Sequence, residues 1–136
     1  MTKSIPLLQK YMTTSPYSIG DDQTIESAHK LMREHKIRHL PVLKDNKLVG
    51  VITQRDLALI ETLRDVDPTK VKIDDAMSTQ VYTADPSAPI DEVVLTMAEH
   101  KYGSCVAMQN GKVVGIFTMV DACRALGELL HNRLAH

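Results

Sequence analysis

The chain is poor in aromatic side chains and in cysteine. Its 136 residues include four Tyr, one Phe and no Trp, so its core has to be built from Ile, Leu, Val, Met and Ala. No apolar run approaches the roughly 20 residues that a membrane helix needs, and the start lacks the apolar stretch of a secretory signal. The two cysteines, Cys105 and Cys123, form no Cys-x-x-Cys pair. Two scattered thiols suit a reducing cytoplasm, and we expect each to be a small buried apolar side chain.

The chain also lacks an excess of charge of either sign. Sixteen Lys and Arg against seventeen Asp and Glu leave a formal net charge of −1. Nucleic-acid binding draws on counterion release at a basic surface and on stacking against aromatic rings. The charge balance and the few aromatics therefore argue against a nucleic-acid platform. A composition of 43% hydrophobic and 24% charged residues is ordinary for a folded soluble domain.

What the sequence does contain is an internal repeat. A shift of 65 residues aligns residues 12–57 with residues 77–122 without a gap. We divide the chain into a first repeat, 1–66 with an N-terminal extension, and a second, 67–136 with a C-terminal helix. Neither copy is long enough to bury a full core alone. We therefore expect the two to pack face to face around a pseudo-two-fold axis as one compact module.

Each copy predicts the order strand, helix, strand, strand, helix. Ile90, Val93, Val94 and Met97 follow the spacing of one helix face, and the first copy repeats this after Thr24, a predicted N-cap. The expected extended segments are 16–19 and 81–84, the strand pairs are 37–43 with 47–53 and 102–108 with 112–118, and second helices begin near Gln54 and Met119. Pro41 predicts an edge or an irregularity in its strand. The predicted fold class is α/β (α+β), with two pseudo-symmetric β-α-β-β-α repeats.

One motif is shared densely by the two copies. Thr53-Gln54-Arg55-Asp56 follows a buried strand, and Thr118-Met119-Val120-Asp121 repeats it. Thr-x-x-Asp at the start of a helix is close to a capping box, which satisfies otherwise unpaired N–H groups. The same geometry offers N–H donors and a hydroxyl to a phosphate, and a carboxylate to the two hydroxyls of a ribose. Both interpretations stay open, because duplication copies a cap as faithfully as a binding site.

These residues give the chain a resemblance to a tandem pair of CBS domains (named after cystathionine β-synthase), also called a Bateman module. The most specific matches are residues 37–42, Ile-Arg-His-Leu-Pro-Val, and residues 50–57, Gly-Val-Ile-Thr-Gln-Arg-Asp-Leu. The resemblance covers Met12 to about Leu126. It implies a regulatory module that binds adenosine-containing ligands in clefts between the repeats, and that pairs into a homodimer.

The resemblance also implies which residues bind the ligand. Asp56 and Asp121 would hold the ribose, and Thr53 and Thr118 would lie by the ribose or phosphate. The remaining residues predicted to line the sites are Ser18, Arg38, His39, Arg55, Thr83, Lys101, Gly103 and Ser104.

The two predicted sites differ in charge. The first copy has Arg38, His39 and Arg55, cations that can pair with phosphates, where the second has Gly103, Ser104 and Val120, although Lys101 is nearby. We therefore predict unequal sites, in which affinity depends chiefly on Asp56 or Asp121, whichever cleft receives the arginines.

The predicted function is that of a sensor for AMP, ADP, ATP or an S-adenosylmethionine-like ligand. It would change the conformation of a dimer or the contact with an unknown effector protein. The alternative is a structural or protein-interaction module with empty clefts. No nucleophile–base pair or metal-ligand set indicates an enzyme or a metal requirement, and a cytoplasmic protein without a membrane or nucleic-acid partner is expected. The tail 126–134 has helical spacing and either packs on its own domain or extends into a partner interface.

Overall fold

The computed structural model describes residues 4–63 and 65–134, which form two compact units. One unit comprises residues 16–81; the other combines residues up to 15 with residues from 82 onward. The ends of the predicted repeats, 1–3 and 135–136, lie outside the described residues. The compact units and the sequence repeats divide the chain at different residues, because the segment that opens each repeat packs on the other copy.

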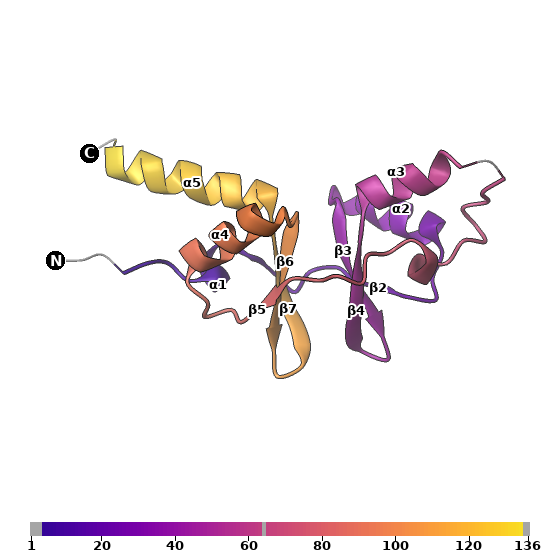
Figure 1. The fold of residues 1–136 in the computed structure, drawn as a ribbon, viewed down its shortest axis with the longest axis horizontal. Coiled ribbons are helices and arrows are strands. Elements are labelled where there is room, and N and C mark those ends of the chain that lie inside the picture. The colour runs from indigo at the N-terminus through magenta and orange to yellow at the C-terminus, as the bar shows by residue number, and fades with distance from the viewer. Residues whose placement is uncertain (1–3, 64, 135–136) are drawn as a thin grey trace. The chain divides into compact units, whose positions relative to one another are not determined.

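The unit of residues 16–81 is a three-stranded sheet with its helices on one side (Figure 1). Its elements are β2 (Ile19–Gly20), α2 (Ile25–His35), β3 (His39–Lys44), β4 (Lys47–Thr53), α3 (Gln54–Glu61) and a 3-10 turn, Ile73–Asp75. Strand β3 lies between β2, to which it is parallel, and β4, to which it is antiparallel. The turn residues Asp45 and Asn46 both have positive φ, as a tight hairpin requires.

The other unit repeats this arrangement with an added strand. Its elements are α1 (Leu8–Tyr11), β1 (Thr13–Thr14), β5 (Thr83–Ala84), α4 (Ile90–His100), β6 (Ser104–Gln109), β7 (Lys112–Thr118) and α5 (Met119–Leu134). The strand order is β1-β7-β6-β5. The predicted β-α-β-β-α order is therefore confirmed in both copies, and the chain has the α/β architecture that the repeat indicates.

Strand β3 is the central strand of its sheet, so of the two alternatives predicted from Pro41 the structure has the irregularity and not the edge position. Strand β2 pairs only with Val42 and Leu43, so Pro41 lies beyond the end of that ladder. The β3–β4 register also shifts between Val42 and Leu43. A residue without an N–H donor is accommodated here because β2 requires no hydrogen bond from it.

Each unit has its own hydrophobic core. In residues 16–81 the core is formed by helix α2, the sheet and Leu57, and Ile73 from the segment between the repeats is fully buried in it. In the other unit Phe117 is fully buried among Leu8, Val93 and Cys105. Burial raises the pKa of the Cys105 thiol to about 12, because the thiolate loses its hydration. Cys123 is exposed on α5, so the expectation that both cysteines are buried is wrong for Cys123.

Two buried glycines lie where the segment that opens one repeat pairs with a strand of the other copy; we call these the exchanged segments. Thr13 pairs with Ile116, and the repeat-related Ser78 pairs with Val51. A Cβ on Gly50 would lie 2.7 Å from the Ser78 carbonyl oxygen, and one on Gly115 would lie 2.4 Å from the Met12 sulfur. Each glycine therefore lets an incoming segment approach its strand closely.

Candidate functional site

The start of helix α3 is built by a reciprocal hydrogen-bonded cap. Thr53 ends β4 in an extended conformation and is the N-cap of α3. Its side-chain oxygen accepts from the Asp56 N–H at 3.1 Å, and its own N–H donates to Asp56 Oδ2 at 2.9 Å. The Thr53 hydroxyl also donates to Oδ2, at 2.9 Å. Asp56 Oδ1 accepts no hydrogen bond from the described residues, so one carboxylate oxygen at this helix start is available.

The start of α5 has the same cap with one addition. The Thr118 N–H donates to Asp121 Oδ2 at 2.9 Å, and the Asp121 N–H donates to Thr118 Oγ1 at 3.4 Å. Arg124, one helical turn further on, donates from Nη1 to Asp121 Oδ1 at 3.2 Å. Asp121 is 7% exposed, the most deeply buried charged residue in the described chain. Both oxygens of this carboxylate are therefore engaged.

The β3–β4 ladder places the predicted cations at the start of α3. His39 lies opposite Thr53 in the ladder, and the Gln54 N–H donates to the Arg38 carbonyl at 2.9 Å. Arg55 is the second residue of the helix. Arg38, His39, Thr53, Arg55 and Asp56 therefore come together around one helix N-terminus, where the helix dipole favours anions.

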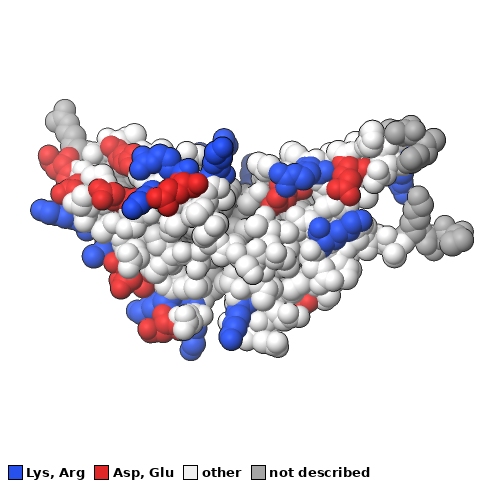
Figure 2. Space-filling model, turned by 180° about the vertical axis from the view of Figure 1, so that it is seen from behind, with Lys and Arg blue, Asp and Glu red and all other residues white. Residues whose placement is uncertain are grey.

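The arginines at this helix start have no carboxylate partner in the described part of the chain. Arg38 and Arg55 are exposed, and among the described residues neither lies within ion-pairing distance of an acid. On the face drawn in Figure 2, basic and acidic side chains are interspersed rather than gathered into a patch of one sign. The positive charge at α3 is thus a local feature, of the kind that fits an anionic group on a small ligand.

In the other unit, Gly103, Ser104 and Val120 stand where the first copy has Arg38, His39 and Arg55. Ser104 lies opposite Thr118 in the β6–β7 ladder, and the Met119 N–H donates to the Gly103 carbonyl at 3.3 Å. Lys101 ends α4 in a left-handed conformation and is exposed. Five of the six predicted residues of this copy therefore also lie near one helix start: Lys101, Gly103, Ser104, Thr118 and Asp121.

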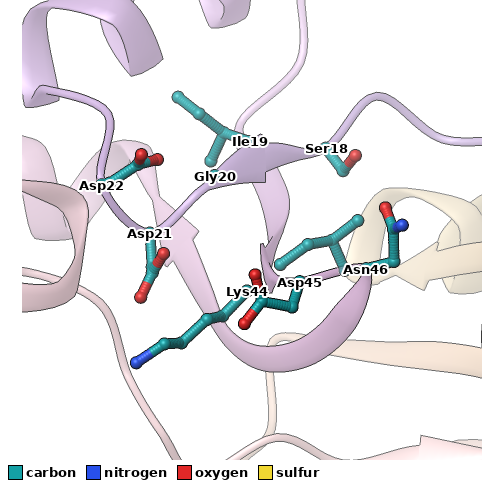
Figure 3. Close-up of a pocket in the computed structure, with 9 residues that line it drawn as sticks. Ser18, Ile19, Gly20, Asp21, Asp22, Lys44, Asp45 and Asn46 are labelled. Atoms are coloured by element: carbon teal, nitrogen blue, oxygen red, sulfur yellow. The ribbon is translucent and has the colours of Figure 1, made fainter.

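Ser18 and Thr83 lie away from these helix starts along their sheets. Ser18 precedes β2 and lines a hollow of about 630 Å³, whose other walls are Ile19–Asp22 and Leu43–Asn46 (Figure 3). It also lines a second hollow with residues of α2, including Lys30 and Glu34. Thr83 is exposed at the start of β5, opposite Val106. Within its own unit, neither hydroxyl joins the Thr–Asp cap.

An apolar hollow of about 430 Å³ lies beside the start of α5, and it was not among the predicted site features. Its lining residues are Val94, Met97, Ala98, Lys101, Tyr102, Gly103, Met119 and Ala122. Tyr102 stacks on Tyr82, and burial raises the pKa of Tyr82 above its ordinary value. The signal that predicts the hollow is the repeat itself, since Ala122 and Ala125 stand where the first copy has Leu57 and Ile60.

Two other features of the described residues bear on function. They contain no group of three or more His, Cys, Asp and Glu side chains placed to hold a metal ion. None of the helices in this part of the chain has the length and apolarity that a membrane crossing requires.

Comparison with known proteins places these features in a family. A model described as the CBS domain matches residues 8–60 and 73–128. The CBS domain-containing protein YhcV of Bacillus subtilis is 29% identical over 125 residues, which are 92% of this chain and 84% of that protein. Hypoxic response protein 1 of Mycobacterium tuberculosis is 31% identical over 111 residues, which are 81% of this chain and 78% of that protein.

A solved structure agrees with the family in fold. The CBS domain pair of protein MJ0100, in complex with 5′-methylthioadenosine and S-adenosyl-L-methionine, is 29% identical with a TM-score of 0.84. The match covers 93% of this chain and 99% of that one. With one repeat matched in each half and the same architecture throughout, the chain belongs to the CBS domain family and carries a tandem CBS pair.

Proposed function

We propose that the chain is a regulatory module that binds an adenosine-containing ligand at the start of α3 and signals its presence to a partner. The observation that carries the proposal is that an available carboxylate oxygen and two arginines, which form no ion pair with the described residues, occur at the same helix start. Asp56 Oδ1 accepts no hydrogen bond from the described residues, and Arg38 and Arg55 lie at the same helix N-terminus.

Each group at this helix start matches part of a nucleoside ligand. The Asp56 carboxylate can accept from the hydroxyls of a ribose while Oδ2 still caps the helix. The N–H groups of the first turn and the guanidinium groups of Arg38 and Arg55 can donate to a phosphate or a carboxylate. Thr53 is shared between the cap and the ligand. The likeness to the MJ0100 pair, which is described with two adenosyl compounds, supports ligands of this class.

The ligand class we propose is therefore AMP, ADP, ATP or an S-adenosyl compound, bound without a required metal and without catalysis. The location we propose is the cytoplasm, since the sequence has only two cysteines and no Cys-x-x-Cys pair. The exposed apolar residues of α5, which include Val120, Leu126 and Leu130, support assembly into a homodimer or contact with an effector protein. Sedimentation of the purified chain, alone and with ligand, tests this assembly.

A structural or protein-interaction role without a ligand is the second candidate, and one observation favours it. Both aspartates already serve as helix caps, so their presence in both copies has a sufficient structural reason. Under this alternative, replacing Asp56 would lower stability and change nothing else.

A thermal-shift panel distinguishes the two roles. AMP, ATP, S-adenosylmethionine and 5′-methylthioadenosine are added to the wild type and to Asp56→Ala, and each variant is compared with its own ligand-free state. A ligand at 100 times its Kd should stabilise the wild type by about 2.7 kcal/mol. Loss of a hydrogen bond to a charged group should weaken binding by Asp56→Ala about tenfold to a hundredfold. No shift with any of the four at millimolar concentration would overturn the proposed function.

A further inference from the structure

The two caps use their nearby arginines in opposite ways. At α3 the carboxylate has a vacant oxygen, and Arg38 and Arg55 have no acidic partner among the described residues. At α5 the carboxylate is the acceptor for Arg124, and Arg124 lies one turn along the same helix. The residue of the first copy that corresponds to Arg124 is Leu59, whose side chain is 59% exposed and offers no hydrogen bond.

We propose that Arg124 is a specificity-determining residue that keeps Asp121 from binding a ligand hydroxyl, and so makes the two sites of the chain unequal. This inference rests on the proposed function. Arg124 Nη1 lies 3.2 Å from Asp121 Oδ1, the oxygen equivalent to the vacant one of Asp56. A ribose hydroxyl has to displace the guanidinium before it can reach that oxygen.

The cost of this displacement is set by how the two partners are exposed. The Asp121 side chain is 9% exposed, whereas that of Arg124 is 68% exposed. A partly solvated ion pair contributes only modestly to the free energy, so a ligand hydroxyl can displace the guanidinium at a small cost. The apparent Kd of the Asp121 site is its intrinsic Kd divided by the fraction of molecules in which Arg124 is unpaired. The carboxylate itself stays in place, because Thr118 holds its other oxygen.

The choice of ligand separates this role from a second one. An arginine near a nucleotide site can also attract phosphate directly, which would strengthen binding. The ligand 5′-methylthioadenosine carries the ribose without a phosphate, and AMP carries both. If Arg124 covers the carboxylate, its removal strengthens binding of 5′-methylthioadenosine. If Arg124 binds phosphate, its removal weakens binding of AMP and leaves 5′-methylthioadenosine unaffected.

The test isolates each site by substitution and measures both ligands by titration calorimetry. In an Asp56→Ala background the remaining binding reports on Asp121. Adding Arg124→Leu, which installs the residue type of the first copy, should tighten 5′-methylthioadenosine about fivefold. Arg133→Leu, on the same helix and exposed, is the matched control and should change nothing. Because Arg124 is so exposed, thermal unfolding should show both double variants folded.

The reciprocal experiment introduces an arginine one helical turn after Asp56. Leu59→Arg should weaken 5′-methylthioadenosine at Asp56 by a similar factor, whereas Leu63→Arg, at a side chain of nearly equal exposure, should have no effect. The inference is overturned, and the proposed function is not, if Arg124→Leu leaves 5′-methylthioadenosine binding unchanged or weaker. The same holds if the Asp56→Ala background shows no detectable binding while the wild type binds. A wild type and an Arg124→Leu variant that bind neither ligand overturn the proposed function and the inference with it.

Discussion

The two units have the same backbone plan, but their helices differ in how they cover the sheet. In residues 16–81, a hydrogen bond between His29 and Glu61, which is an ion pair only with His29 protonated, joins α2 and α3. The corresponding residues of the other unit are Val94 and Leu126, which cannot form an ion pair. There the space between α4 and α5 is an apolar hollow of about 430 Å³.

The core residues beneath the helices account for this difference. Leu57 is fully buried in one unit, whereas Ala122 occupies the equivalent position in the other. Phe117 occupies the position equivalent to Ile52, so in this unit the strand has the larger side chain and the helix the smaller one. The two units thus keep the same order of helices and strands and the same caps although the core side chains around them differ. Function can therefore diverge between the copies without a change of fold.

The largest predicted effect concerns the two buried glycines. Gly50→Ala would bring a Cβ to within 2.7 Å of the Ser78 backbone oxygen, which is held by its pairing with Val51. Gly115→Ala meets only atoms of the Met12 side chain, which can rotate away. We expect a loss in unfolding free energy of about 3 kcal/mol for Gly50→Ala and about 1 kcal/mol for Gly115→Ala, measured by urea denaturation.

Removing the contacted methionines tests the cause of that difference. In a Met12→Ala background the cost of Gly115→Ala should vanish, whereas in a Met77→Ala background most of the cost of Gly50→Ala should remain. If Gly50→Ala and Gly115→Ala lower the unfolding free energy equally in the wild-type background, the atoms that each new Cβ meets move away equally easily.

The second prediction is that alkaline pH weakens the unit that contains Cys105. The pKa of this thiol is raised from 9.0 to about 12 in the folded chain. Between these values the unfolded chain has lost the proton and the folded chain keeps it, so unfolding releases a proton and stability falls as pH rises. The slope should reach about 1.4 kcal/mol per pH unit in unfolding measured from pH 8 to pH 11.

Cys105→Ala provides the control for this pH dependence. It should lower stability at pH 8 through the lost packing and flatten the slope above pH 9. Leu40, the corresponding residue of the first copy, has no ionisable group. A slope unchanged by Cys105→Ala would assign the alkaline sensitivity to another residue, such as Tyr82, whose pKa burial also raises.

Much of this fold follows from local sequence patterns. The predicted strands at 47–53 and 112–118 match the observed bounds, and the helices begin at Gln54 and Met119 as expected. The Thr-x-x-Asp spacing predicts the two caps because a cap involves only four consecutive residues. The predicted N-cap of α2 is also correct, since the Thr24 side chain accepts a hydrogen bond from the Ser27 N–H.

The features that were missed depend on residues far apart in the chain. No local pattern marks Ile73 as a core residue of the first unit, yet it is fully buried with α2 and the sheet. The exchange of the opening segments rests on the pairing of Thr13 with Ile116, a contact that no local pattern encodes. Arg124 stands at the right spacing to reach Asp121, but a lone i, i+3 pair is too common to single out. The cations Arg38, His39 and Arg55 were predicted to gather, and the β3–β4 register places them together.

The third prediction treats the two caps as equivalent. Thr53→Ala and Thr118→Ala each remove a side-chain acceptor for a helix N–H, and each should lower the free energy of unfolding by about 1 kcal/mol. Thr→Ser retains the hydroxyl and should recover most of the loss at both positions. Costs that differ between the copies by more than about 1 kcal/mol would show that Arg124 or the burial of Asp121 alters the α5 cap.

The smallest predicted effect concerns the ion pair that only one unit has. The side chains of His29 and Glu61 are 31% and 38% exposed, so solvent screens their attraction. Glu61→Gln should lower the unfolding free energy by less than about 1 kcal/mol, and high salt should reduce the difference from the wild type. Glu34→Gln, an exposed acid on α2 without an ion pair among the described residues, is the matched control. A larger loss at Glu61 that salt does not reduce would mean that helix packing, rather than charge, holds α2 and α3 together.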